Sequence, residues 1–585
     1  MEQGGKFPPC FFPEASAAGN DRKTTKPIHM NTSRHNIRRT AALLAAAAFC
    51  LLAACGKDST DGDDGNNGNG GGNGGGGVTP PPVEEQVIYA APGGFSNNEG
   101  TFESPYDLKT AISKLRPGWT LYLRGGEYNI RARIDMNKNI QGTPTASSPI
   151  RIWAYADEKP VINCRHAVGT ADNPYTEGIR NKDVDYVHWK GLELKNAWNH
   201  GFRIEYASHN TYENCVSHHN SGAGFFIGFS NEKMDRDDIN PDGESCAYNV
   251  YINCDAYMNF DYHTYKGGGT EHTPGTNADG FAAKCKPGKG NKYYNCRAWS
   301  NSDDGWDLYE ATGGVEMINC WCWKTSIWTD YEEMYKERIR WEKEDGIYKG
   351  NFADELTEKL FAGNGNGFKM GGACYFSNGA NWENHNHLSR GIHVLRHCIS
   401  FNNLRWGFDQ NNHVDGAYVE NCIAFNNGNT KNLSNFGFRQ INMHGTKFVF
   451  RNCISFGAKN RDSFTNATCE FDHNSWNEIK GRNKSWTPFD ATASYNTYKA
   501  QFISLSEEDA GAPRKADGSL PDRFGRLAAG SIFIDMGAPT ADIDTYAETS
   551  ALGGYDRPER YNTIRLSPIP YSGPAPDLGM YEYGN

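Results

Sequence analysis

The chain has 585 residues and a net charge of −11 at neutral pH, from 59 lysines and arginines against 70 aspartates and glutamates. An acidic chain of this kind is not expected to bind nucleic acid, because the phosphate backbone would repel it. The length is ample for a sizeable hydrophobic core.

The N-terminal region does not have the composition of a folded domain. Residues 1–29 show no periodic pattern, and we interpret them as an over-extended gene start. Residues 30–54 resemble a bacterial lipoprotein signal, with arginines after Met30 and an apolar run, too short to span a membrane, that ends in Leu-Ala-Ala before Cys55. The alternative is a chance apolar stretch. We predict that Cys55 is lipidated and that acyl chains hold the exported protein at the outer membrane or cell surface, or alternatively at its periplasmic face.

Residues 55–85 are predicted to form a flexible tether. Their early aspartates resemble a bacterial surface-export signal, and the Gly/Asn stretch and prolines that follow cannot bury a core. The folded domain is predicted to span 86–585. Near its start, 105–115 has the pattern of a short amphipathic helix and 120–124 that of a strand. We expect the helix to cover the open first coil of a repeat structure.

Two interleaved repeats run through the middle of the chain, a tripeptide Gly-aromatic-x and a dipeptide Asn-Cys. Undisturbed units have 10 residues from the dipeptide to the next glycine and 14 or 15 from that glycine to the next dipeptide, so the unit is about 24 residues long. Short aromatic and β-branched segments at this period predict an all-β fold, a parallel β-helix with three strands per coil. The tripeptides begin at Gly201, Gly224, Gly280, Gly305, Gly367, Gly407 and Gly437. The dipeptides begin at Asn214, Asn253, Asn295, Asn319, Asn421 and Asn452, with His397-Cys398 as a variant.

The dipeptide predicts two stacked rows of side chains. The asparagine amides should bond from coil to coil, and the cysteines should point inward as small apolar groups. Seven of the 16 cysteines occupy this one position, so we expect most to be free thiols. Cys246 and Cys285 lie outside the row and are candidates for a disulfide. The repeats fade beyond residue 475, and 579–583 is predicted to be a closing strand.

Four aspartates are predicted to converge on the helix surface. Asp279 and Asp304 precede repeat glycines and so occupy the same slot in adjacent coils. Asp303 lies beside Asp304, and Asp307 is the third residue of its tripeptide. Four carboxylates within one or two strand spacings form the oxygen-rich anionic set that Ca²⁺ prefers. The alternatives are that these aspartates serve only turn formation, or that the calcium is purely structural.

Lys369 is the third residue of the next tripeptide, one coil beyond Asp307. A lysine is usually a solvated surface group. Beside a bound dication the pKa of this lysine should be lowered, so that it can act as a general base at mildly alkaline pH.

At these residues the sequence resembles a known enzyme family. The segments 277–284, 301–307, 363–372 and 407–412 are similar to the signature blocks of polysaccharide lyase family 9, calcium-dependent pectate lyases built on a right-handed parallel β-helix. The resemblance implies that the four aspartates bind calcium and that Lys369 is the Brønsted base.

The reaction expected from these groups is β-elimination. The proton α to a uronate carboxylate is weakly acidic, and calcium on that carboxylate would stabilise the enolate-like transition state. The lysine would take the proton, and the glycosidic oxygen at C4 would leave. The expected substrate is the galacturonate-containing backbone of plant cell-wall pectin, with rhamnogalacturonan as the alternative within the family. The sequence is also compatible with a β-helix glycoside hydrolase or a non-catalytic surface glycan-binding protein. We expect a monomer.

An insertion lies next to the predicted base. Between Asn319 and Gly367 the expected 10 residues become 48, and the insert 329–362 contains two segments expected to be helical, 330–343 and 352–361. It is either a wall or lid over the site or a surface loop. Further candidates for contact with the sugar carboxylates are Lys284, Arg203, Arg405, Asn411 and Arg439.

Overall fold

The computed structural model describes residues 86–584 except 138–139, 171, 230–239, 266–270, 349–351, 373–388, 479–482 and 486–497. The predicted gene start, signal, lipidated Cys55 and tether lie outside the described residues. Within the described part of the chain, no helix is long and apolar enough to cross a membrane.

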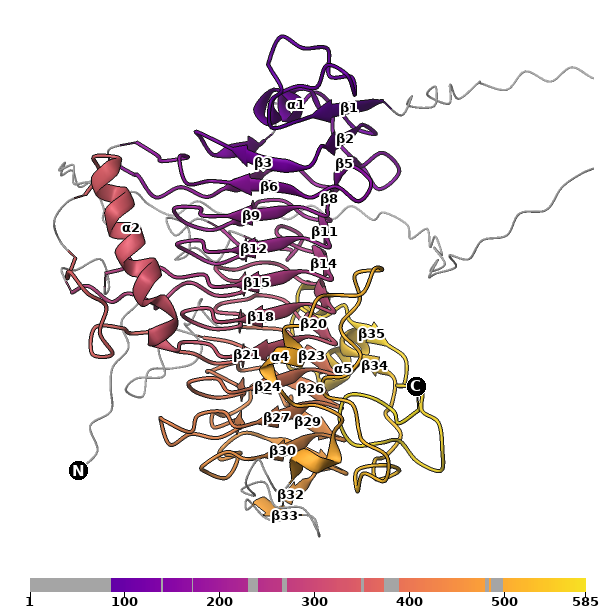
Figure 1. The fold of residues 1–585 in the computed structure, drawn as a ribbon. Coiled ribbons are helices and arrows are strands. Elements are labelled where there is room, and N and C mark those ends of the chain that lie inside the picture. The colour runs from indigo at the N-terminus through magenta and orange to yellow at the C-terminus, as the bar shows by residue number, and fades with distance from the viewer. Residues whose placement is uncertain are drawn as a thin grey trace, which may run out of the picture. The chain divides into compact units, whose positions relative to one another are not determined.

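Three parallel sheets stack short strands along one axis (Figure 1), and in the middle of the molecule each coil adds one strand to each sheet. This is the right-handed parallel β-helix that the repeats and the family resemblance predicted. Sheet A consists of β1 (Val87–Ala90), β2 (Thr120–Leu123), β5 (Ile150–Ala154), β8 (Val187–Lys190), β11 (Thr211–Glu213), β14 (Val250–Ile252), β17 (Asn291–Tyr294), β20 (Val315–Ile318), β23 (His393–Arg396), β26 (Ala417–Glu420), β29 (Phe448–Arg451) and β31 (Cys469–Asp472).

The other two sheets complete the coils. Sheet B consists of β3 (Gly126–Asn129), β6 (Pro160–Asn163), β9 (Glu193–Lys195), β12 (Val216–His218), β15 (Asp255–Tyr257), β18 (Arg297–Trp299), β21 (Trp321–Trp323), β24 (Ile399–Phe401), β27 (Ile423–Phe425) and β30 (Ile454–Phe456). Sheet C consists of β4 (Ile134–Met136), β7 (Ile179–Lys182), β10 (Phe202–Glu205), β13 (Phe225–Ile227), β16 (Phe281–Ala283), β19 (Trp306–Asp307), β22 (Phe368–Lys369), β25 (Phe408–Asp409) and β28 (Phe436–Gly437).

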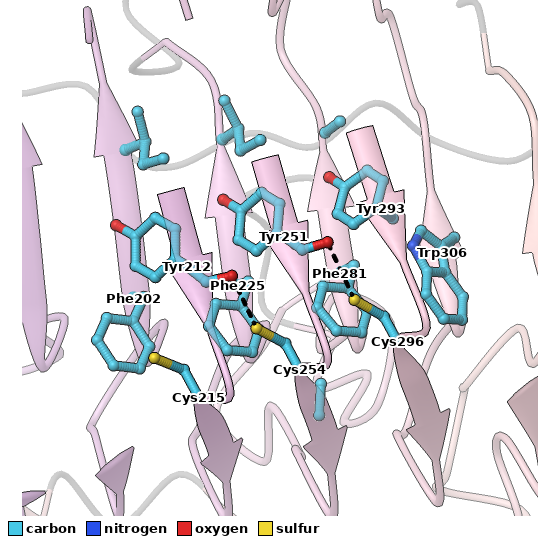
Figure 2. Packing of buried hydrophobic residues seen from close by; sticks show 14 of the residues in the cluster. Phe202, Tyr212, Cys215, Phe225, Tyr251, Cys254, Phe281, Tyr293, Cys296 and Trp306 are labelled. Atoms are coloured by element: carbon cyan, nitrogen blue, oxygen red, sulfur yellow. Dashed lines mark hydrogen bonds between the residues drawn. The ribbon is translucent and has the colours of Figure 1, made fainter. Parts of the chain in front are cut away.

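The interior is built from columns of like side chains (Figure 2). The aromatic residues of the tripeptides stack ring on ring, with 5.2 Å between the centroids of Phe202 and Phe225 and 5.1 Å between Phe225 and Phe281. Beside them, the thiol of Cys254 donates to the backbone carbonyl of Tyr212 at 3.4 Å. The predicted cysteine row is therefore confirmed, and its seven members are buried free thiols. No disulfide joins Cys246 to Cys285.

The predicted asparagine row is also confirmed. The side-chain amide of Asn253 donates to Asn214 at 3.0 Å, and that of Asn295 donates to Asn253 at 3.0 Å. A second row, inside the helix, was not predicted: its members follow the row cysteines by five residues in the sequence. Its bonds run from Asn220 to Asn259 at 2.9 Å and from Asn259 to Asn301 at 2.8 Å.

The last tripeptide does not keep the predicted register. Phe436, not Phe438, stacks on Phe408, and Gly437 rather than Arg439 pairs with Asp409. Because Phe436 and Phe438 are two residues apart, both point to the same face of an extended chain, and the sequence pattern cannot tell which one joins the column. The prediction that Arg439 continues the row of third positions is therefore wrong.

Two of the three predicted helices, those at 105–115 and 330–343, are present. Helix α1 (Leu108–Lys114) begins at the N-cap Asp107 and buries Leu108, Ala111 and Ile112 in the main core, so it covers the first coil as expected. Helix α2 (Glu332–Glu344) follows the 3₁₀ turn η4 (Trp328–Tyr331) and forms the body of the insert.

The second predicted helix of the insert, 352–361, is not helical in its described residues. Its end forms a single turn, in which the backbone N–H groups of Leu360 and Phe361 both donate to the carbonyl of Thr357. Phe352 and Leu356 instead pack into the hydrophobic cluster under α2. Ten residues make only a marginal helix without packing to support it, and here the apolar residues dock as a loop.

After the last coil the chain returns along the outside of the helix (Figure 1). We call 498–583 the C-terminal arm; its Phe502, Phe524 and other apolar side chains cover Phe401 and neighbouring outward residues of sheet B. The predicted closing strand at 579–583 is wrong, because these residues form no strand. The remaining elements are β32 (Trp476–Glu478), β33 (Asn483–Ser485), η6 (Lys499–Gln501), α4 (Glu507–Ala510), β34 (Ile543–Asp544), α5 (Thr545–Leu552), η7 (Pro558–Arg560) and β35 (Arg565–Leu566).

Candidate active site

The four aspartates converge on sheet C. Asp307 and Lys369 are direct partners in the parallel register of β19 and β22. The backbone N–H of Asp304 donates to the carboxylate of Asp279 at 3.2 Å, as expected for equivalent slots in adjacent coils. Asp279, Asp303, Asp304 and Asp307 each offer a carboxylate oxygen within 4.8 Å of the others, and all four side chains are buried. We call these four residues the acidic cluster.

Two lysines contact the acidic cluster. Lys369 Nζ lies 2.9 Å from Asp304 Oδ2 and 2.9 Å from Asp307 Oδ2. Lys284 Nζ lies 2.7 Å from Asp279 Oδ2 and 2.6 Å from Asp307 Oδ2. The sequence placed Lys284 among residues that contact substrate, and the structure places it among the aspartates. Four carboxylates therefore face two ammonium groups.

Backbone and amide donors orient the carboxylates. The N–H of Asn364 donates to Asp303 at 3.0 Å. The N–H and the side-chain amide of Asn366 donate to Asp304 Oδ1 at 2.8 and 2.9 Å. Both asparagines lie between the insert and Lys369, so the end of the inserted segment is attached directly to the acidic cluster. A loop of this length is tolerated here because its return to the coil is fixed by these bonds.

Four carboxylates lie against two ammonium groups in the acidic cluster, and burial opposes ionisation of the carboxylates. Burial raises the pKa of Asp279 to about 8; Asp307 and Asp304 add to this rise, and Lys284 opposes it. Burial also raises the pKa of Asp303 well above its usual range, with the charge of Asp304 adding to the effect. Four buried carboxylates supply the oxygen ligands that fit a divalent cation such as calcium, whose charge would favour their ionised forms.

The pKa of Lys369 is shifted upward. Burial acts to lower it, but the charges of Asp304, Asp307 and Asp303 outweigh burial and raise it well above its usual range. The sequence-based expectation of a lowered pKa assumed carboxylates that are engaged by a dication. When the same carboxylates pair with the lysine itself, the sign is reversed.

Arg203, another predicted contact residue, is part of a partly buried ion-pair group. It lies three coils before Asp307 in the same row of sheet C. Its guanidinium donates to Glu177 at 2.7 Å, and Glu177 also pairs with Arg133 at 2.8 Å. The charge of Arg203 is therefore engaged within the protein.

Three further predicted residues lie on the C-terminal side of Lys369. Arg405 donates to the side chain of Asn364 at 2.7 Å. Asn411 donates to the carbonyl of Gly371 at 2.9 Å, and so holds the turn that follows the lysine. Arg439 stacks over the ring of Trp406, 4.8 Å from its centroid, and 37% of its side chain is exposed.

A buried histidine that the sequence analysis missed supports Lys369 from behind. His393 Nε2 lies 3.0 Å from the carbonyl of Met370, and its Nδ1 accepts the N–H of Val315 at 3.1 Å. His393 also stacks on His413 at 4.2 Å. One sequence signal could have pointed to His393: it is the first residue of a sheet A strand, β23, and a polar residue, Asn291, likewise begins the sheet A strand β17.

The insert is anchored along coils that precede Lys369. Tyr331, Tyr335 and Trp341 pack with Trp198 and Phe260 in one hydrophobic cluster. At the C-terminal end of α2, its last residue Glu344 pairs with Arg165 at 2.9 Å, and the C-cap Asp345 pairs with the same arginine. These contacts hold η4 and α2 against the segments that connect sheet B to sheet C.

Comparisons with known proteins identify the family and the fold. Residues 88–474 match a family described as the Pel9A-like, right handed beta helix region. Pectate lyase L of Dickeya dadantii (strain 3937) is 30% identical over 503 residues, which cover 84% of this chain and 90% of the relative. Pectate lyase PEL9 of Emericella nidulans is 29% identical over 348 residues, 58% of this chain and 73% of the relative.

Solved structures show the same likeness. The crystal structure of pectate lyase Pel9A is 29% identical, with a TM-score of 0.58 over 85% of this chain and 96% of that chain. A rhamnogalacturonan lyase is 21% identical, with a TM-score of 0.51 over 76% of this chain and 96% of that chain, a likeness of fold alone.

Proposed function

The chain belongs to the Pel9A-like family of right-handed β-helix proteins, and on that premise we propose that it is a polysaccharide lyase that cleaves the galacturonate-containing backbone of pectin by calcium-assisted β-elimination. The observation that carries the proposal is the pairing of Lys369 with Asp307 in the row of sheet C where four buried carboxylates converge. A hydrolase would need one carboxyl group kept protonated as an acid beside a second that acts as base or nucleophile. A lysine among four carboxylates suits proton abstraction better.

The acidic cluster would hold the calcium ion, through Asp279, Asp303, Asp304 and Asp307. The fit rests on their oxygen donors, their burial and their number, four carboxylates against two ammonium groups. When bound, calcium would neutralise the uronate carboxylate and favour loss of the adjacent proton.

Lys369 is the proposed base. Its nitrogen must be neutral to accept the α proton, so it must first lose its own proton and its contacts with Asp304 and Asp307. As its lone pair takes the proton, the C–H electrons become the C4–C5 double bond, and the C4–oxygen bond breaks with its electrons leaving on the oxygen. His393 holds the backbone at Met370, next to the base, and thereby limits the positions that the ammonium group can reach.

Substrate contacts are proposed for side chains that flank Lys369 on the same surface. Arg439 is the best placed of the predicted set, because it is partly exposed beside Trp406, and an arginine can bind a sugar carboxylate in a bidentate manner. Arg405 and Asn411 are proposed to hold the segments on either side of the base. Arg203 is proposed to shape the surface through Glu177 rather than to bind substrate directly.

We further propose that the enzyme is an exported lipoprotein, anchored through Cys55 and the tether 55–85 and placed where it meets plant cell-wall polysaccharide. The support is the sequence pattern of the N-terminal region.

The test is ultraviolet absorbance during incubation with polygalacturonate, with calcium and with excess chelator. A calcium-dependent rise is expected, because elimination creates an unsaturated product. The same incubations are made with rhamnogalacturonan. New reducing ends without absorbance would identify a hydrolase, and silence in both readouts on both polymers would favour a binding protein or a different uronate polymer. A response to rhamnogalacturonan alone would move the substrate to the related backbone.

A further inference from the structure

Lys284 has an unusual position for a surface-strand lysine. It follows β16 directly, it is only 9% exposed, and its ammonium group bridges Asp279 Oδ2 and Asp307 Oδ2. Asp307 Oδ2 is shared with Lys369. Two of the four proposed calcium ligands are thus bound by a cation that the chain itself supplies.

The main chain at Lys284 is held in place. Its N–H donates to the carbonyl of Ile227 at 3.0 Å, and the next two N–H groups along the chain donate to the carbonyls of Tyr309 and Glu310 at 3.1 and 3.0 Å. The backbone therefore cannot follow the ammonium group if that group leaves the carboxylates. The ammonium group can therefore leave the carboxylates only by rotation about its side-chain bonds.

The ammonium group and a dication need the same oxygens. Each contact of Lys284 uses a carboxylate oxygen that a calcium ion would also approach, and two cations at one pair of carboxylates repel each other. This repulsion would favour displacement of Lys284 when a dication binds.

We propose that Lys284 is an internal counter-cation that competes with the divalent cation for Asp279 and Asp307 and so sets the affinity of the site. The proposal rests on the function proposed above, and it goes further by assigning to one residue two opposite effects. Lys284 stabilises the fold when calcium is scarce, because it separates buried carboxylates. It weakens calcium binding, because it must be displaced.

The matched variants are Lys284→Met and Lys289→Met. Both remove a buried ammonium group from the same stretch of chain, but Lys289 pairs with Glu244 at 2.7 Å and with the carbonyl of Glu559 at 2.7 Å, outside the acidic cluster. Lys284→Arg keeps the positive charge and serves as a second control.

Calcium affinity is measured by isothermal titration into protein freed of divalent cations with chelator, and stability by thermal unfolding in chelator. Lys284→Met should tighten the Kd for calcium by roughly tenfold or more and lower the Tm in chelator by several degrees. Lys289→Met should leave the Kd unchanged, and Lys284→Arg should stay close to the wild type.

A variant-free measurement covers the case in which Lys284→Met does not fold. Reductive methylation of the wild-type protein, read by peptide mass spectrometry, should label Lys284 faster with calcium than without it, while labelling of Lys289 stays the same. An unchanged or weaker Kd in Lys284→Met, or labelling of Lys284 that calcium does not alter, would overturn the proposal. A wild-type protein that binds no calcium would instead contradict the metal of the proposed function.

Discussion

Two buried ionic groups in this β-helix have opposite charge balance. The acidic cluster on sheet C sets four carboxylates against Lys284 and Lys369. On the outer face of sheet B, one carboxylate faces two guanidinium groups: Asp255 accepts hydrogen bonds from Arg297 at 2.7 Å and from Arg514 at 2.6 Å. We call this second group the seam, because Arg514 belongs to the C-terminal arm and Asp255 to β15.

The pKa values of the two groups differ accordingly. Burial acts to raise the pKa of Asp255, but Arg514 and Arg297 outweigh it and lower the pKa to about 2. The pKa of Asp279 is raised to about 8. Burial of charge alone thus does not mark a functional site. In the acidic cluster the raised pKa means that ionising the buried carboxylates costs stability, and a bound cation would offset that cost.

Replacement of Lys369 by alanine should have the largest effect on function. Turnover of polygalacturonate should fall by about a thousandfold, since a positioned general base contributes factors of this size. The fold and binding of the polymer should persist, as measured by circular dichroism and by a pull-down with insoluble polygalacturonate. A rate close to that of the wild type would remove Lys369 as the base.

Asp255→Asn should have the largest effect on stability. It keeps the shape of the side chain but leaves two buried guanidinium groups without their carboxylate, which costs about 3–5 kcal/mol of unfolding free energy. Urea unfolding measures this, and turnover of the folded variant should be unchanged. Asp135→Asn is the control: its ion pair with Arg180 is partly exposed, so a loss of under about 1 kcal/mol is expected. Equal losses of unfolding free energy in the two variants would contradict the expectation that the buried ion pair contributes more than the partly exposed one.

The seam should also contribute to acid sensitivity. The pKa of Asp255 is lower in the folded protein than its ordinary value of 3.8, so its stabilising effect is complete above about pH 4–5 and is lost as the pH falls toward 2. Between about pH 5 and pH 2 the wild type should lose about 2 kcal/mol more unfolding free energy than Asp255→Asn. Parallel pH profiles of the two proteins would show that Asp255 does not titrate in this way.

Arg340→Ala should have the smallest effect. This residue of α2 carries charge, but 64% of its side chain is exposed, and its nearest carboxylates, on Glu337 and Glu344, lie 3.6 Å away. The expected change in unfolding free energy is within about 0.5 kcal/mol. A larger loss would show that exposed charges on the insert contribute as much as buried ones.

Periodicity made much of this molecule predictable. The slots of Asp279 and Asp304, and the pairing of Lys369 with Asp307, follow from the period alone, because equivalent residues of a parallel β-helix must stack. The asparagine and cysteine rows follow for the same reason. A repeat supplies contacts between residues far apart in the sequence, which a non-repeating sequence does not reveal.

The sequence-based predictions fail where the repeat is interrupted or where the position of a side chain does not depend on it. Lys284 reaches the acidic cluster from the end of β16, and no spacing rule gives the direction of a long flexible side chain. Phe436 and Phe438 satisfy the same alternation, so only packing decides between them. The C-terminal arm has no repeat, and its course over sheet B depends on contacts such as Arg514 with Asp255 that no local pattern encodes.

The C-terminal arm changes how the whole β-helix can unfold. A stack of coils that touch only their neighbours can lose coils one at a time from an open end. Here the arm binds coils that are far apart along the axis, through Arg514 to the carbonyl of Asn295, through Ser567 to Arg396 and through Gly579 to Asn452. Loss of the last coil therefore requires release of the arm, and release of the arm exposes the apolar face of several coils together. The arm links these coils into one cooperative unit, so fraying from the end is replaced by a single transition with a higher barrier.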